Sequence, residues 1–135
     1  MGWRKQFKEG WDSAAIPDPT VPTGPLAELA ARPLPQLAAD LFATCFAPET
    51  KGWVDGMSQS DATNTFLESA GLGSAPDQPH LANAIVAEAF QLLEHRGLMC
   101  MFLGTGGSTV HVHWYVTRAG RAAAKSGELP AKLKS

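Results

Sequence analysis

Charged residues and cysteines are scarce in this chain. Acidic and basic side chains make up 18% of the 135 residues, and only two residues are cysteines. Both Cys45 and Cys100 lie in apolar stretches, and no neighbouring pattern of residues would lower the pKa of either thiol. We therefore expect two reduced thiols in the core, rather than a disulfide or a catalytic cysteine.

Long apolar runs are absent as well. No run approaches the ~18 consecutive apolar residues that cross a bilayer, and the first residues contain no apolar stretch of the signal-peptide type. These absences predict a cytoplasmic protein without a membrane span.

The sequence also lacks the motifs that carry catalysis. It has no Gly-x-Ser-x-Gly, no zinc cluster and no identifiable acid–base pair. The stretch Gly104–Ser108 is rich in glycine, but it lacks the lysine of a phosphate-binding loop and joins two predicted strands. His111 and His113 would stand about 7 Å apart on one strand face, yet no cysteine or carboxylate lies at a metal-ligand spacing from them. We predict no enzyme, no metal site and no cofactor.

Charge is distributed unevenly along the chain. Residues 1–16 carry a net charge of +1, residues 17–117 carry −7, and residues 118–135 carry +4. An acidic body with basic ends is unfavourable for nucleic-acid binding unless the ends do the binding.

The first residues contain an aromatic stripe. Trp3, Phe7 and Trp11 recur every four residues and would share one face of a short helix. Such a stripe either packs on the domain's own core or docks a partner protein; a membrane surface is the third alternative. Four prolines follow between Ile16 and Pro25 and predict a semi-rigid linker. We expect an aromatic arm (1–16), a proline-rich linker (17–25), one domain (26–126) and a polar tail (127–135).

Within the domain, the apolar pattern predicts mainly helices and one hairpin. The clearest amphipathic helix spans about Leu81–Arg96 and ends at Gly97. The other expected elements are a short helical turn from Leu26, a helix from Leu34 or Pro35 to Phe46, a turn or short strand at Lys51–Gly56, a helix capped by Ser60 or Asp61 and running to Ala70, strands at Leu98–Leu103 and Val110–Val116, and a helix at Ala119–Lys125.

The last third of the chain resembles the end of a winged-helix domain. In that family the third helix closes with Leu-x-x-x-Gly-Leu, a two-stranded wing follows, and Leu-Thr-x-x-Gly-Arg opens the next helix. The matching positions are Leu93, Gly97, Leu98, Val116, Thr117, Gly120 and Arg121, with valine in place of the family's leucine. Regulators of the MarR and PadR type carry this pattern. The chain is also similar to the front module of some bacterial proteins related to abortive infection, in which the matching residues are Glu88, Ala89, Leu93, Glu94, Gly97, Leu98, Trp114, Thr117, Arg118 and Gly120. The resemblance implies a winged-helix fold, mainly α with a small antiparallel β-hairpin.

Two functions follow from this resemblance. The first is a small bacterial or phage regulator that binds double-stranded DNA. Its candidate contacts are Asn83, Gln91 and Arg96 on or beside the long helix and a basic patch of Arg118, Arg121 and Lys125. However, the hairpin contains no charged residue, and phosphate neutralisation supplies much of the binding energy to DNA.

The second function is a protein-interaction module, such as an adaptor in phage defence or a homodimer. Its candidate contacts are the aromatic arm with Trp3, Phe7 and Trp11 and the apolar hairpin with Met99, Met101, Phe102 and Leu103. A fold alone does not decide between the two functions.

Overall fold

Three helices form the centre of the molecule. The computed structural model describes residues 20–73, 77–106 and 109–134, and its central helices are α3 (Leu34–Cys45), α5 (Gln59–Ser69) and α6 (Pro79–His95). Their buried faces meet in one core that includes Phe42, Phe46, Phe66 and Phe90, each at most 1% exposed. The predicted helices near 34–46, 61–70 and 81–96 are confirmed to within a few residues.

The segment before α3 is attached to the start of α6. Helix α2 (Pro25–Ala31) buries Leu26 and Leu29. Just before it, the backbone N–H and the hydroxyl of Thr23 both donate to Oε1 of Gln78 at 2.9 and 3.1 Å, and Nε2 of Gln78 donates to the carbonyl of Val21 at 2.9 Å. The end of the predicted linker is thus held to the helical body.

The segment between α3 and α5 differs from the prediction. Residues 51–56 were expected to form a turn or short strand, but Lys51–Asp55 forms a short helix, α4, because Trp53 turns inward and is 8% exposed. Strand β1 (Met57–Ser58) follows. The predicted cap of α5 was also wrong, since Oγ of Ser58, and not Ser60 or Asp61, caps the helix by accepting the N–H of Asp61.

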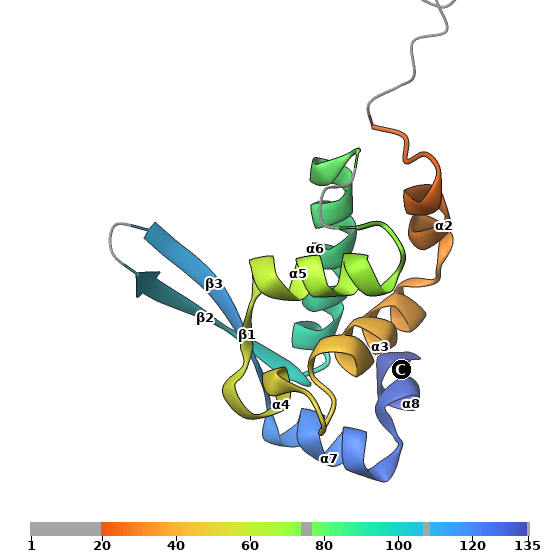
Figure 1. Ribbon diagram of the computed structural model, residues 1–135. Helices are drawn as coiled ribbons and strands as arrows, with labels where there is room; N and C mark the ends of the chain where they lie inside the picture. Colours follow the sequence, from red (N-terminus) through yellow and green to blue (C-terminus); the bar gives the residue numbers. More distant parts are fainter. Residues whose placement is uncertain (1–19, 74–76, 107–108, 135) are drawn as a thin grey trace, which may run out of the picture.

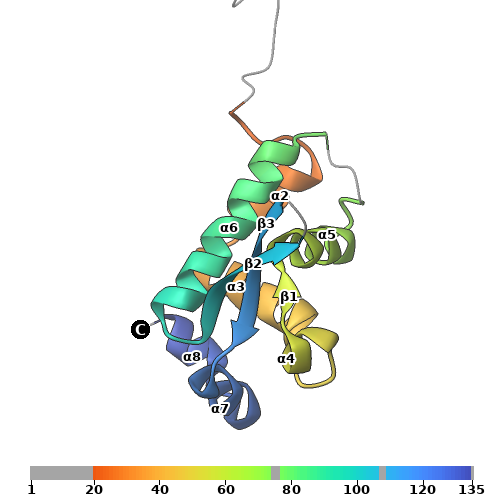
Figure 2. The same cartoon turned by 90° about the vertical axis from the view of Figure 1, so that its left-hand side faces the viewer.

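A small antiparallel sheet packs beside the helices. Strands β2 (Met99–Gly106) and β3 (Thr109–Val116) form a hairpin, and β1 pairs with the other edge of β3, which gives the order β1-β3-β2. Trp114 of β3 stacks on Phe90 of α6 with ring centroids 4.6 Å apart, and its Nε1 donates to Oε1 of Gln59. These contacts fasten the base of the hairpin to the helices. Its far end projects away from the helices in Figure 1 and towards the viewer in Figure 2.

The junction between α6, the hairpin and α7 (Arg118–Ser126) forms as its sequence motif predicts. Gly97 has a φ of +72°, a left-handed conformation that turns the chain from α6 towards β2. Thr117 caps α7 by accepting the N–H of Gly120 at 3.0 Å, and its hydroxyl donates to the carbonyl of Gly97. Gly120 packs directly against the carbonyl of Leu98, where a side chain would overlap the backbone.

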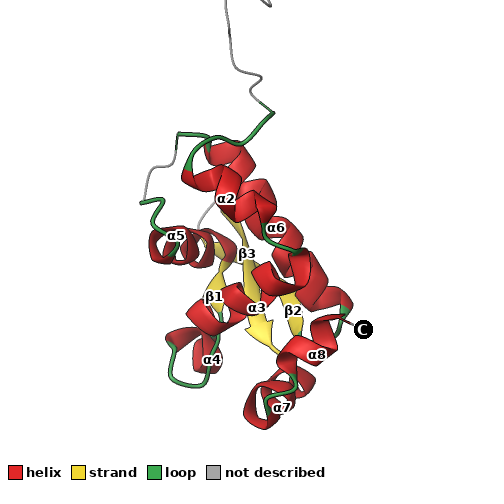
Figure 3. Cartoon of the chain, turned by 90° about the vertical axis from the view of Figure 1, so that its right-hand side faces the viewer, coloured by secondary structure: helices red, strands yellow, loops and turns green. Residues whose placement is uncertain are grey.

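The end of the chain is part of the body. Residues 127–135 were expected to form a polar tail, but Leu129–Lys134 forms a further helix, α8. It packs on α3 (Figure 3), and Leu129 and Leu133 are 8% and 1% exposed. The structure therefore corrects the predicted tail, because two leucines four residues apart give even this short helix a buried face.

The two cysteines have different environments. Cys45 is buried in the core, as expected, and burial raises the pKa of its thiol to about 12. Cys100 lies exposed on β2. The expectation of a core thiol was wrong for Cys100, because alternate residues of a strand face opposite sides.

This difference predicts selective thiol chemistry. At pH 8 a thiol reagent is expected to modify one cysteine per native chain, Cys100, since the Cys45 thiol remains protonated and covered. Two cysteines should react once the chain is unfolded in guanidinium. Mass spectrometry of labelled peptides measures this directly, and rapid native labelling of Cys45 would contradict the buried position.

Candidate interaction surface

The two faces of the hairpin have different side chains. Directly opposed residues of an antiparallel pair point to the same face, so the register assigns each pair to one side. The face towards the helices holds Met99 with Val116, Met101 with Trp114, Leu103 with Val112 and Thr105 with Val110, and the opposite face holds Cys100 with Tyr115, Phe102 with His113 and Gly104 with His111. Both faces carry large apolar or aromatic side chains.

The outer part of the hairpin leaves apolar side chains exposed. Trp114 is only 3% exposed, whereas Val110 on the same face, four residues nearer the tip, is 66% exposed. Five of the eight large hydrophobic residues that are exposed among the described residues belong to this hairpin: Met101, Phe102, Leu103, Val110 and Tyr115, which we call the hairpin patch. An exposed apolar group of this size is typical of an interaction site.

The hairpin patch includes residues that the sequence did and did not predict. Met101 and Phe102, proposed as partner contacts, are 45% and 62% exposed. Met99 was also suggested but is 1% exposed, because it lies at the base of the hairpin. Tyr115 was not predicted as a partner contact. In the structure it meets Phe102 edge to face, with ring centroids 5.8 Å apart. The other partner candidates, Trp3, Phe7 and Trp11, lie outside the described residues.

A shallow groove lies beside the hairpin. It is lined by the start of α5, by Asn83 of α6 and by β3: Ser58, Gln59, Ser60, Thr63, Asn64, Asn83, Val110, His111 and Val112. Of the two amide residues predicted to contact bases, both Asn83 and Gln91 are exposed on α6, and Asn83 borders the groove. The groove lining contains no aspartate, glutamate, lysine or arginine. Its surface therefore offers mainly neutral hydrogen-bonding groups.

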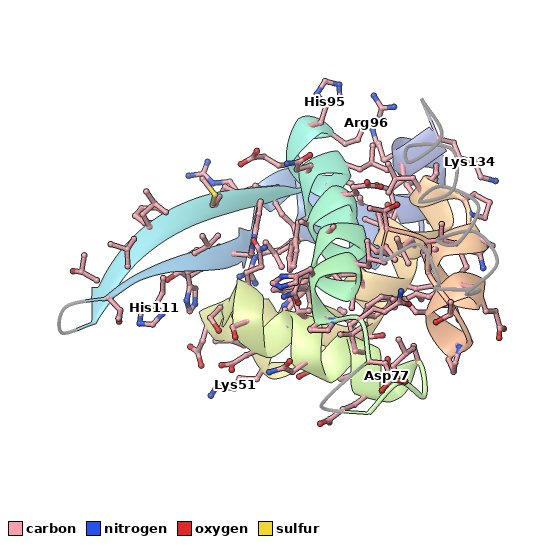
Figure 4. The ribbon with its side chains drawn as sticks, turned by 90° about the horizontal axis from the view of Figure 1, so that it is seen from above. Lys51, Asp77, His95, Arg96, His111 and Lys134 are labelled. Carbon is pink, nitrogen blue, oxygen red and sulfur yellow. The ribbon has the colours of Figure 1, made fainter. Side chains whose placement is uncertain are left out.

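The basic residues predicted for DNA binding lie elsewhere. Arg96 follows α6 and lies about 20 Å from Asn83 along the helix axis. Figure 4 labels it beside His95, at the end of the helix. Arg96 borders a different hollow, between α6, α7 and α8, together with Lys132. Arg118 and Lys125 are exposed on α7. The structure thus separates the amides of the groove from these cations.

Arg121 is held within the fold. Its Nη2 donates to the carbonyl of Trp53 at 2.6 Å, and its guanidinium carbon lies 4.9 Å from the centre of the Trp53 ring. These contacts fasten α7 to α4, and the hydrogen bond uses one of the donors that a phosphate would otherwise take. Arg121, predicted as part of a basic patch that binds DNA, thus makes a contact within the fold.

Comparison of the chain with protein-family models, curated proteins and solved structures finds no match. Function is therefore inferred from the surface itself. No helix in the described part of the chain is long and apolar enough to cross a membrane. Within the same residues, no three His, Cys, Asp or Glu side chains are grouped so that they could hold a metal ion.

Proposed function

We propose that this chain is a winged-helix domain that binds another polypeptide through the hairpin patch and acts as an adaptor. The order of elements supports the fold: α3, the short α4, β1, α5, α6 and then the β2–β3 hairpin, in a sheet with the order β1-β3-β2. This order resembles that of winged-helix domains. In that comparison the hairpin of this chain corresponds to the wing, and α6 corresponds to the recognition helix.

The observation that carries the protein-binding function is the chemistry of the hairpin. Residues 98–116 contain no aspartate, glutamate, lysine or arginine, and this segment supplies the whole hairpin patch. A wing that binds DNA usually approaches phosphates, which require cations or backbone donors. Apolar and aromatic side chains instead gain free energy when another polypeptide covers them.

A sequence-specific DNA regulator is the second candidate. It is favoured by the neutral amides of Gln59, Asn64 and Asn83 around one groove, since asparagine and glutamine pair well with adenine. The groove lacks lysine and arginine, however, and the exposed residues Asp61 and Glu88 stand on the two helices beside it. If this groove faced DNA, both carboxylates would repel the phosphate backbone of the DNA.

A titration with random-sequence duplex DNA tests this distinction. We expect no binding at 50 mM salt up to tens of micromolar protein, because non-specific affinity depends on phosphate neutralisation. Replacing Arg118 and Lys125 by Ala should then leave the anisotropy of the DNA unchanged as well. Fluorescence anisotropy across a salt series measures the affinity, and an affinity that falls steeply with salt would support the regulator instead.

The docking function has its own test, with the protein immobilised as bait. Phe102 and Val54 are 62% and 71% exposed, but only Phe102 belongs to the hairpin patch. We expect a partner held by the natural chain to be retained by the Val54→Lys variant and lost with Phe102→Lys. Equal capture by both variants would assign the docking to another surface.

A further inference from the structure

The outer edge of β2 has no neighbouring strand. In the order β1-β3-β2, β2 is paired on the β3 side alone among the described residues. Its eight residues pair with β3 in an unbroken register from Met99 to Gly106, so the backbone N–H and C=O groups of the other edge form a regular row. Such edges usually carry a charge, a proline or a bulge that blocks pairing with another chain. Strand β2 has none of these.

We propose that the edge of β2 pairs with β2 of a second copy of this chain, in an antiparallel arrangement about a two-fold axis. The two hairpins then form one continuous sheet with the order β1-β3-β2-β2-β3-β1. The proposal rests on the proposed function, since it names the polypeptide that the β2 residues of the hairpin patch, Met101, Phe102 and Leu103, bind. Each copy contributes the same surface, as a closed two-fold dimer requires.

The register of the dimer follows from the geometry of strands. Opposed residues in an antiparallel pair share a face, and successive residues alternate between faces. When a strand pairs with its own copy about a two-fold axis perpendicular to the sheet, one residue must therefore stand opposite itself. Phe102 is the middle of the three successive large apolar side chains that β2 exposes, Met101–Leu103. Centring the axis there places Phe102 opposite Phe102 of the second copy and Met101 opposite Leu103.

Charge favours a second copy as the occupant. In the register centred on Phe102, Met101 stands opposite Leu103 of the second copy and Phe102 opposite Phe102, so the opposed pairs at the axis are all apolar. Neither β2 nor β3 contains an aspartate, glutamate, lysine or arginine, so no two like charges meet in this pairing, and an acidic or basic partner would find no counter-charge from these residues on the hairpin.

The exposed side chains of β2 also fit this occupant. Met101, Phe102 and Leu103 are 45%, 62% and 62% exposed, and a second β2 strand at the edge would cover part of each. The same contact pairs the free backbone groups of two eight-residue strands.

The molecular mass in solution tests the proposal. We expect a dimer at tens of micromolar by light scattering or analytical ultracentrifugation. Phe102→Lys places two ammonium groups against each other at the axis and should weaken the dimer at least about 100-fold. Val54→Lys, a change on α4 at a side chain that is 71% exposed, should remain a dimer. The melting temperatures of both variants establish that they are folded.

Cross-linking tests the register. With Cys100 replaced by Ser, Phe102→Cys brings two thiols together across the axis, where opposed Cα atoms stand about 5 Å apart, within reach of a disulfide. The matched control is Thr105→Cys, also exposed on β2, whose two copies would stand about 20 Å apart. Mild oxidation should yield a covalent dimer of the first variant only. Preferential cross-linking of the control would overturn the proposed register.

The outcomes separate this proposal from the proposed function. A natural chain that is monomeric at hundreds of micromolar overturns the dimer. The occupant of the β2 edge would then be residues 1–19 of the same chain or a different protein. Capture of another protein that depends on Phe102 would then leave the adaptor function standing. A dimer that Phe102→Lys does not weaken also overturns the β2 pairing. Steep salt-dependent binding to DNA contradicts the adaptor function and leaves the measured mass to decide the dimer.

Discussion

Replacing Gly120 by alanine is expected to lower the free energy of unfolding by about 2–3 kcal/mol, as overpacking of a tight contact does. Within a helix such a change normally stabilises, by roughly 0.5–1 kcal/mol. Here the new Cβ would overlap the backbone carbonyl of Leu98 and lie 3.0 Å from Cγ1 of Val116. That carbonyl also accepts the N–H of Thr117 at 3.1 Å, so it cannot move away without losing a hydrogen bond.

The matched control is Gly104→Ala on the hairpin. At Gly104 the nearest atom to the added methyl group would be the carbonyl oxygen of His111 at 4.0 Å, so the stability should change by less than about 0.5 kcal/mol. Chemical denaturation of the two variants beside the natural chain gives both values. If Gly120→Ala were as stable as the natural chain, the close approach of α7 to β2 would be disproved.

Local chemistry explains why much of the fold was predictable. Helix α6 could be predicted because a 17-residue amphipathic pattern ends at a glycine, and the hairpin because a glycine-rich turn separates two apolar runs. The roles of Gly97, Thr117 and Gly120 follow from caps and close contacts within a short stretch of chain. The contacts of Thr117 with Gly97 and of Gly120 with Leu98 span only the hairpin, whose two apolar runs and glycine-rich turn the sequence displays directly.

The features that were missed depend on residues far apart in the chain. Helix α4 has five residues and is fixed by Trp53, which Arg121 contacts across 68 positions. No local pattern shows that this arginine is engaged within the fold. The exposure of Cys100, Val110 and Tyr115 depends on how far the hairpin projects beyond the body, which is decided by packing at its base. The candidate surface was therefore predicted only at Met101, Phe102 and Leu103.

The end of the chain gives the second large effect. Leu133→Ala is expected to lower the free energy of unfolding by about 3 kcal/mol, within the range measured for buried leucines, and the melting temperature by roughly 10 °C. Leu133 is 1% exposed, and α8 packs on α3, so the change leaves a cavity inside the main core. Thermal unfolding followed by circular dichroism measures the loss.

Lys134→Ala, next to Leu133 but exposed, provides the control and should change the stability by less than about 0.5 kcal/mol. Its charge reaches solvent, whereas the leucine reaches the core. If both substitutions lowered the stability equally little, residues 127–135 would be a polar tail, as the sequence predicted. A large effect of Leu133→Ala alone would extend the domain to α8. The basic end of the chain, with Lys132 and Lys134, would then be part of the folded surface and not an arm available to wrap a nucleic acid.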